Sequence, residues 1–172
     1  MNYPDIALQV PEVILPSADV ALDRWAVIAC DQYTSEPEYW ERVGRDVGEA
    51  PSALNLVLPE AHLERPDRGE LIAGIGRRME AFLDEGLLRQ LEPGFVLIDR
   101  QTPRLPSRRG LLVALDLDRY DYRRDSRSLI RPTEGTVVSR LPPRIEIRRG
   151  ALLELPHVMV LIDDPERTVI EP

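Results

Sequence analysis

The sequence contains no lysine, and all 22 of its basic residues are arginines. This absence excludes a Schiff base, a lysine nucleophile and the lysine of a P-loop. A single cysteine, Cys30, excludes an intramolecular disulfide and a zinc site built from cysteines. With only Cys30, His62 and His157 available, widely separated along the chain, no Ser-His-Asp or Cys-His arrangement can be argued.

The sequence also lacks long apolar runs, and none approaches the ~18 residues of a membrane span. Residues 1–5 show no basic region followed by an apolar run, so we expect a cytoplasmic protein without a membrane partner. Acidic residues outnumber basic ones 30 to 22, which gives a net charge of −8. Such a surface opposes association with nucleic acid backbones, so a DNA-binding role ranks last.

Length and composition predict one folded domain over residues 1–172. Apolar residues make up 43% of the chain, so its 16 prolines indicate fixed corners between short elements and not disorder. No internal repeat or linker divides the sequence. The oligomeric state stays open at this point.

Capping patterns predict three main helices. The first follows Ser35 as N-cap, has Pro37 in its first turn and Glu38 in a capping box, and ends near Gly48. The second runs from Asp67 to Gly86, with apolar residues at helical spacing. A third should begin at Pro142–Pro143, although residues 144–149 also alternate like a strand.

Short apolar runs predict buried strands between these helices. The runs are Trp25–Cys30, Leu54–Leu58, Phe95–Arg100, Gly110–Leu117 and His157–Asp164. The third and fourth suit a hairpin with a longish loop. Together with the helices they predict a single α/β domain with a mixed sheet.

The stretch from Leu129 to Arg144 is the most suggestive for ligand binding. It places hydroxyl-bearing and flexible residues between arginines and leads into the third helix through two prolines. Backbone N–H groups, hydroxyls and guanidinium groups could donate to phosphate oxygens here, from Arg131, Thr133, Gly135, Thr136, Arg140 and Arg144. A Thr-Gly-Thr turn between arginines is, however, more often a solvated connection.

Three stretches together resemble one bacterial family, catalogued as domain of unknown function 1015. They are Trp25–Ser35 with Pro37–Trp40, Arg109–Leu111 with Asp116–Tyr122, and Ile130–Val137 with Arg140–Arg144. The pieces Pro156–Val158 and Leu161–Asp164 fit as well. The resemblance implies that the chain corresponds to the amino-terminal half of a usually longer family protein.

The family is distantly similar to the ParB and sulfiredoxin-like superfamily, which binds nucleotide phosphates on a loop leading into a helix. One branch of that superfamily contains free-serine kinases. By position, the resemblance implies a phosphate or nucleotide site at Arg131, Thr133, Glu134, Gly135 and Thr136, to which the loop argument adds Arg144. Many family members have a histidine where this chain has Pro132–Thr133, so no histidine role transfers.

A kinase acting on a small hydroxyl-bearing metabolite, such as free serine, would use ATP or ADP with Mg²⁺ and a carboxylate as general base. Asp31 and Glu36 are the candidates for that base. Asp31 can equally be a turn residue, Glu36 can simply complement the helix dipole, and Glu134 can form an ion pair with Arg131. The alternative function is a non-catalytic scaffold or a small-ligand-sensing domain.

Overall fold

The structure is a computed structural model that describes residues 2–3, 6–121, 123, 125–131, 135, 137–155 and 157–166. The chain divides into two compact units. The helical unit comprises Leu15–Arg89 and Val137–Met159, and the strand unit comprises Met1–Ile14, Gln90–Thr136 and Val160–Pro172. Each unit is described by itself below.

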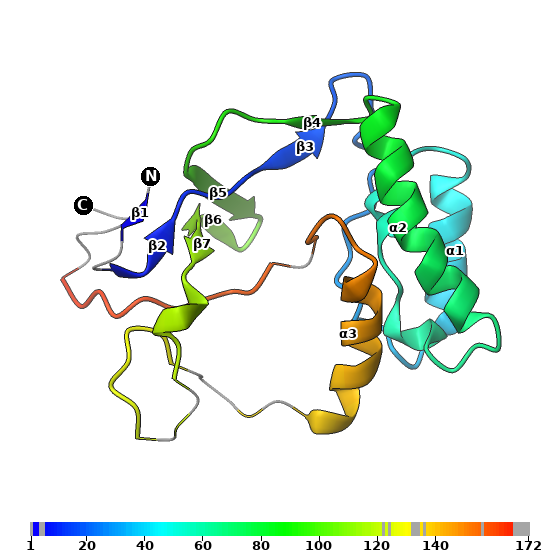
Figure 1. Ribbon diagram of the computed structural model, residues 1–172. Helices are drawn as coiled ribbons and strands as arrows, with labels where there is room; N and C mark the ends of the chain where they lie inside the picture. Colours follow the sequence, from blue (N-terminus) through cyan, green and yellow to red (C-terminus); the bar gives the residue numbers. More distant parts are fainter. Residues whose placement is uncertain are drawn as a thin grey trace. The chain divides into compact units, whose positions relative to one another are not determined.

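The helical unit contains the three predicted helices, which are α1 (Pro37–Val47), α2 (Arg68–Asp84) and α3 (Leu141–Arg149). Helix α2 contacts α3 and the 3₁₀ helix η2 (Ala53–Leu56), and α1 contacts the 3₁₀ helix η3 (Glu60–His62) (Figure 1). A third 3₁₀ turn, η5 (Val138–Arg140), leads directly into α3. No helix among the described residues is long and apolar enough to cross a membrane.

The core of the helical unit lies between these elements. Its buried apolar side chains include Trp40 and Val47 of α1, and Ala53 and Leu56 of η2. Helix α2 contributes four of its apolar residues at helical spacing, namely Ile72, Ile75, Met79 and Phe82, whereas Leu71 and Leu83 of the same pattern are half-buried. Because only one face of α2 is buried, its apolar residues recur at helical spacing, and this spacing makes the helix recognisable from sequence.

The strand unit is built from short strands. Strands β1 (Asn2–Tyr3) and β2 (Leu8–Gln9) pair antiparallel, and β2 also pairs antiparallel with β7 (Ala114–Leu115). Strands β5 (Val96–Thr102) and β6 (Leu105–Leu112) form an antiparallel hairpin, in which Val96 faces Leu112 and Thr102 faces Leu105. A 3₁₀ turn, η4 (Leu117–Arg119), and a parallel bridge between Tyr120 and Ile130 follow.

A further two-stranded sheet joins β3 (Ile14–Pro16) to β4 (Leu88–Gln90), at the points where the chain passes between the two units. The α/β class with three helices is therefore confirmed, and the strands of the described residues form small separate sheets. The hairpin is present with a tighter loop than expected, because β5 extends to Thr102 and β6 begins at Leu105, five residues before the predicted second strand. Thr102 Oγ1 accepts a hydrogen bond from the Leu105 N–H at 3.1 Å across this loop.

The predicted buried strand Trp25–Cys30 is wrong. This segment has no regular secondary structure, and the Val27 side chain is 77% exposed. The N–H of Trp25 donates to the carbonyl of Leu22, and the N–H of Ala26 donates to Ser52 Oγ at 3.0 Å. These donors are therefore used in a local turn and on a side chain, and they are not available for a sheet ladder.

The predicted strand Leu54–Leu58 is also wrong, although the segment is largely buried. Ser52 and Asn55 form a capping box, in which Ser52 Oγ accepts from the Leu54 N–H and Asn55 Oδ1 accepts from the Ser52 N–H. This pair of bonds starts the 3₁₀ helix η2, because it satisfies the backbone donors of a helical turn. Ser52, which is completely buried, thus holds both η2 and the segment around Ala26.

Three further expectations fail, one about a strand and two about helix caps. Residues 157–164 form no strand, and Val158, Met159 and Leu161 are exposed. Helix α1 begins one residue later than Ser35 would set it, because its N-cap is Glu36, whose side chain makes no capping hydrogen bond. The Asp67 carboxylate likewise does not cap α2, because it binds the Arg65 guanidinium at 2.7 and 2.8 Å.

Candidate functional site

One predicted phosphate ligand, Arg144, lies on α3 of the helical unit and contacts Glu60 at the start of η3. Its Nε and Nη2 atoms are 3.2 and 2.7 Å from the same carboxylate oxygen, Oε1. The Glu60 side chain is only 12% exposed, whereas that of Arg144 is 44% exposed. The hydrogen bond to Glu60 raises the pKa of Arg144 above its usual value. The carboxylate therefore orients a guanidinium that solvent still reaches.

Cys30 and Asp31 lie beside this ion pair. The N–H of Glu60 donates to the carbonyl of Cys30 at 2.7 Å, which ties η3 to the segment that ends at Asp31. Burial raises the pKa of the Cys30 thiol, and the carboxylates of Asp31 and Glu60 raise it further, while Arg144 opposes them. The charges of Cys30 and Asp31 also act on Arg144. We call Cys30, Asp31, Glu60 and Arg144 the charged cluster.

The charged cluster brings together two of the residues that the sequence singled out, Asp31 and Arg144, from distant parts of the chain. At neutral pH its two carboxylates and one guanidinium leave one excess negative charge. A guanidinium beside a carboxylate can hold an anionic group next to a proton acceptor.

The other predicted site residues are not members of the charged cluster. Glu36 lines a separate hollow at the start of α1. Arg131 and Gly135 are exposed residues of the strand unit. Thr133, Glu134 and Thr136 lie outside the described residues.

The role of Gly135 in a phosphate site stays a prediction, and a Cβ added to it would meet no described atom within 4 Å. Arg140 belongs to η5, and its contact with phosphate remains a prediction.

Sequence reasoning missed Cys30 and Glu60 as neighbours of Asp31 and Arg144. Glu60 follows Pro59 in what appears from sequence to be an ordinary loop, and no motif distinguishes it. Only the folded chain brings its carboxylate to Arg144, which lies 84 positions away in the sequence. A long-range ion pair of this kind has no local sequence pattern.

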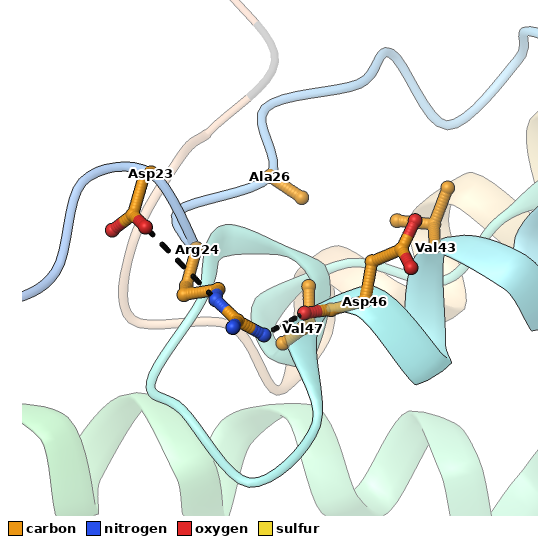
Figure 2. Close-up of a pocket in the computed structure, with 6 residues that line it drawn as sticks. All are labelled: Asp23, Arg24, Ala26, Val43, Asp46 and Val47. Atoms are coloured by element: carbon orange, nitrogen blue, oxygen red, sulfur yellow. Dashed lines mark hydrogen bonds and ion pairs between the residues drawn. The ribbon is translucent and has the colours of Figure 1, made fainter.

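A second hollow, shown in Figure 2, is lined by residues before and within α1, which are Asp23, Arg24, Ala26, Val43, Asp46 and Val47. The Arg24 guanidinium points across it and donates to the main-chain oxygen of Asp46, while its Nε lies 4.0 Å from the Asp23 carboxylate. Arg24 therefore fastens the turn before Trp25 to the end of α1. Its guanidinium is engaged in structure, so we do not assign this hollow to a ligand.

No group of three His, Cys, Asp or Glu side chains in the described part of the chain is arranged to hold a metal ion. Mg²⁺ nevertheless needs only one or two carboxylates when nucleotide phosphates supply its remaining ligands. Asp31 meets that requirement in type and exposure.

Comparison with known proteins decides the family. Residues 14–172, nearly the whole chain, match the family described as "Protein of unknown function (DUF1015)". The chain belongs to this family. No curated protein and no solved structure matches the chain significantly. Family membership confirms the resemblance found in the sequence and leaves the similarity to ParB-like proteins as a hypothesis.

The Cys30 thiol offers a direct test of the charged cluster. Because Asp31 and Glu60 raise the pKa of Cys30 and Arg144 lowers it, we expect Glu60→Gln to speed its alkylation and Arg144→Gln to slow it. The measurement is the rate of iodoacetamide labelling of the intact protein at pH 8, followed by mass spectrometry. Arg148→Gln on the same helix is the control. Equal rates in all three variants would contradict the arrangement.

Proposed function

We propose that the charged cluster binds the phosphate groups of a nucleotide and that the protein transfers a phosphoryl group to a small hydroxyl-bearing metabolite, such as free serine. The observation that carries this proposal is the ion pair of Arg144 with Glu60, whose N–H donates to the carbonyl of Cys30, the residue before Asp31. Arg144 and Asp31 combine a phosphate-binding cation with a carboxylate that can accept a proton.

Arg144 retains the capacity to bind phosphate while it is held by Glu60. A guanidinium has five N–H donors, and Glu60 accepts from the Nε and Nη2 atoms only. The remaining donors and the 44% exposure of the side chain leave room for phosphate oxygens. Glu60 keeps the guanidinium in one orientation, which reduces the entropy lost when an anion binds.

Asp31 would act as the general base. The substrate hydroxyl oxygen forms a bond to the γ-phosphorus of ATP as the bond from that phosphorus to its bridging oxygen breaks, and ADP leaves. The hydroxyl proton passes to the Asp31 carboxylate. Mg²⁺ would neutralise charge on the phosphates when bound. With ADP as donor the same transfer involves the β-phosphorus and releases AMP.

The resemblance separately implies a phosphate or nucleotide site at Arg131, Thr133, Glu134, Gly135 and Thr136. Arg131 precedes a proline, which favours an extended backbone and presents its side chain beside the turn. Glu36 remains a second candidate for the base, and it lines a hollow only a few residues after Asp31.

One observation favours the alternative of a non-catalytic scaffold or sensor domain. The Glu60 carboxylate of the Arg144–Glu60 ion pair is nearly buried. Such an ion pair can also have a purely structural role, in which it fastens α3 to η3. In that case the charged cluster would be complete without a ligand. The two functions therefore differ in whether phosphate compounds bind.

The deciding experiment is calorimetric titration of the protein with ATP, ADP and pyrophosphate, with and without Mg²⁺. We expect Arg144→Gln to weaken binding by about 1.5–3 kcal/mol, because a charged hydrogen bond to phosphate is lost. Arg148→Gln is a matched control, since Arg148 lies one turn further on α3 and forms its own ion pair with Glu154 at 2.9 Å.

Glu60→Gln separates binding from stability. It removes the negative charge beside Arg144 and keeps an amide oxygen that can still accept from the guanidinium, so we expect a lower melting temperature and unchanged or tighter phosphate binding. No binding of any of the three compounds by the wild-type protein would instead support the scaffold.

A second prediction concerns Arg131. Replacement by lysine keeps the charge and loses the planar fork that binds phosphate with two parallel hydrogen bonds. We expect Arg131→Lys to weaken nucleotide affinity by about 1–3 kcal/mol while the melting temperature stays nearly the same. An unchanged affinity with a lower melting temperature would make Arg131 a structural ion-pair partner.

A further inference from the structure

Two tyrosines, the exposed Tyr33 and the half-buried Tyr39, lie against each other shortly after Asp31 in the chain. The rings of Tyr33 and Tyr39 stack with centroids 3.9 Å apart and an interplanar angle of 22°. The Tyr33 side chain is 46% exposed. Stacked and accessible aromatic rings are a common platform for planar ligands.

The backbone holds this pair in place at a conformational cost. Tyr33 has a φ of +51°, in the left-handed region that a bulky side chain rarely adopts. The N–H of Glu36 donates to the Tyr33 carbonyl at 3.0 Å, and the N–H of Tyr39 donates to the Glu36 carbonyl at 3.0 Å. These bonds link the turn at Tyr33 to the first turn of α1.

Trp40 also fixes the orientation of the Tyr39 ring. The two rings meet edge-on, with centroids 5.6 Å apart and an interplanar angle of 89°. Trp40 is buried in the core of the helical unit, so the orientation of Tyr39 is set by the fold. Arg42, one turn further on α1, lies 5.8 Å from the centre of the Tyr39 ring.

A hollow of about 270 Å³ borders Tyr39 and Arg42. Its remaining walls are Ser35, Glu36, Pro37 and Glu38. The volume is close to the lower end of the range for small-molecule sites and suits one flat ring system better than a whole nucleotide. Its polar groups are chiefly carboxylates and one hydroxyl, which accept hydrogen bonds, together with a guanidinium, which stacks on flat rings.

We propose that this hollow binds a nucleobase that carries N–H groups. The base lies against Tyr39 and Arg42, and its N–H groups donate to the carboxylates of Glu36 and Glu38, while Tyr33 acts as a positioning residue. This inference rests on the proposed function and extends it to the base of the nucleotide. Asp31 and Tyr33 are two residues apart, so their Cα atoms are at most about 7 Å apart and one nucleotide can reach both.

The test compares three probes, ADP, adenosine and pyrophosphate, by calorimetric titration. We expect ADP to bind at least about 10-fold more tightly than pyrophosphate, since stacking of a base on aromatic side chains contributes at that level. Tyr39→Leu and Arg42→Gln should each weaken ADP binding about 10-fold and leave pyrophosphate binding unchanged. Tyr39→Phe, which keeps the ring, and Arg45→Gln, one turn beyond Arg42, are the controls.

The outcomes separate this inference from the proposed function. Equal affinities for ADP and pyrophosphate, or ADP binding that neither Tyr39→Leu nor Arg42→Gln weakens, would overturn the base site and leave phosphate binding intact. Adenosine binding that both variants weaken, without any pyrophosphate binding, would support the base site and overturn the proposed function. Absence of binding by all three probes would overturn both. Circular dichroism of each variant establishes that it is folded.

Discussion

Asp31→Asn is expected to reduce the rate of phosphoryl transfer by about 10²- to 10⁴-fold, the usual contribution of a positioned general base. The amide keeps the shape of the side chain and cannot accept the proton of the substrate hydroxyl. Nucleotide affinity should change much less than the rate, because Arg144 remains in place on Glu60. The measurement is transfer of labelled phosphate from ATP or ADP to serine and to a panel of other small hydroxyl compounds.

Asp23→Asn is a suitable control for this experiment. Asp23 is exposed, lies before the same segment and contacts only the Arg24 guanidinium among the ion pairs of the described residues. A rate that falls equally in both variants would point to a general electrostatic effect. A full rate in Asp31→Asn, together with a reduced rate in Glu36→Gln, would move the role of the base to Glu36.

The helices were predictable because their determinants are local. Helix α2 carries Ile72, Ile75, Met79 and Phe82 on one face, and each of these is buried in the structure. Helix α1 has a proline in its first turn and ends at Gly48, which has a positive φ of 61°. Periodicity and such end residues lie within a few positions of one another, so the sequence alone displays them.

The segment that carries Asp31 was misassigned because its structure depends on a distant residue. The apolar run Trp25–Cys30 has the composition of a buried strand. Its Ala26 N–H is taken instead by Ser52 Oγ, and Trp25 packs near Phe82, with ring centroids 6.2 Å apart. Periodicity cannot reveal such tertiary partners, so a run of this length favours a strand by default.

The candidate site was predictable in residue type and only partly in arrangement. The sequence offers Asp31 as a carboxylate that can accept a proton and Arg144 as an arginine of the stretch Leu129–Arg144, and no pattern relates the two. The structure relates them through Cys30 and Glu60, neither of which stands out in the sequence. The Tyr33–Tyr39 stack was equally hidden, because it depends on a left-handed backbone at Tyr33.

Trp40→Ala is expected to lower the free energy of unfolding by about 3–5 kcal/mol, the usual cost of removing a large buried aromatic side chain. Trp40 is only 3% exposed and supports Tyr39 edge-on, so the same change should also disturb the tyrosine stack. Urea unfolding of the variant, followed by circular dichroism, measures the effect. Adenosine titration of the folded fraction then measures the loss at the proposed base site.

Trp40→Phe distinguishes the packing of this residue from its polarity. The indole N–H is buried and has no hydrogen-bond partner among the described residues, so the wild-type protein already bears the cost of an unsatisfied donor. Phenylalanine removes that donor and keeps most of the apolar contact with the core and Tyr39. We therefore expect Trp40→Phe to lie within about 1.5 kcal/mol of the wild type. A loss as large as that of Trp40→Ala would show that the indole ring is held by more than packing.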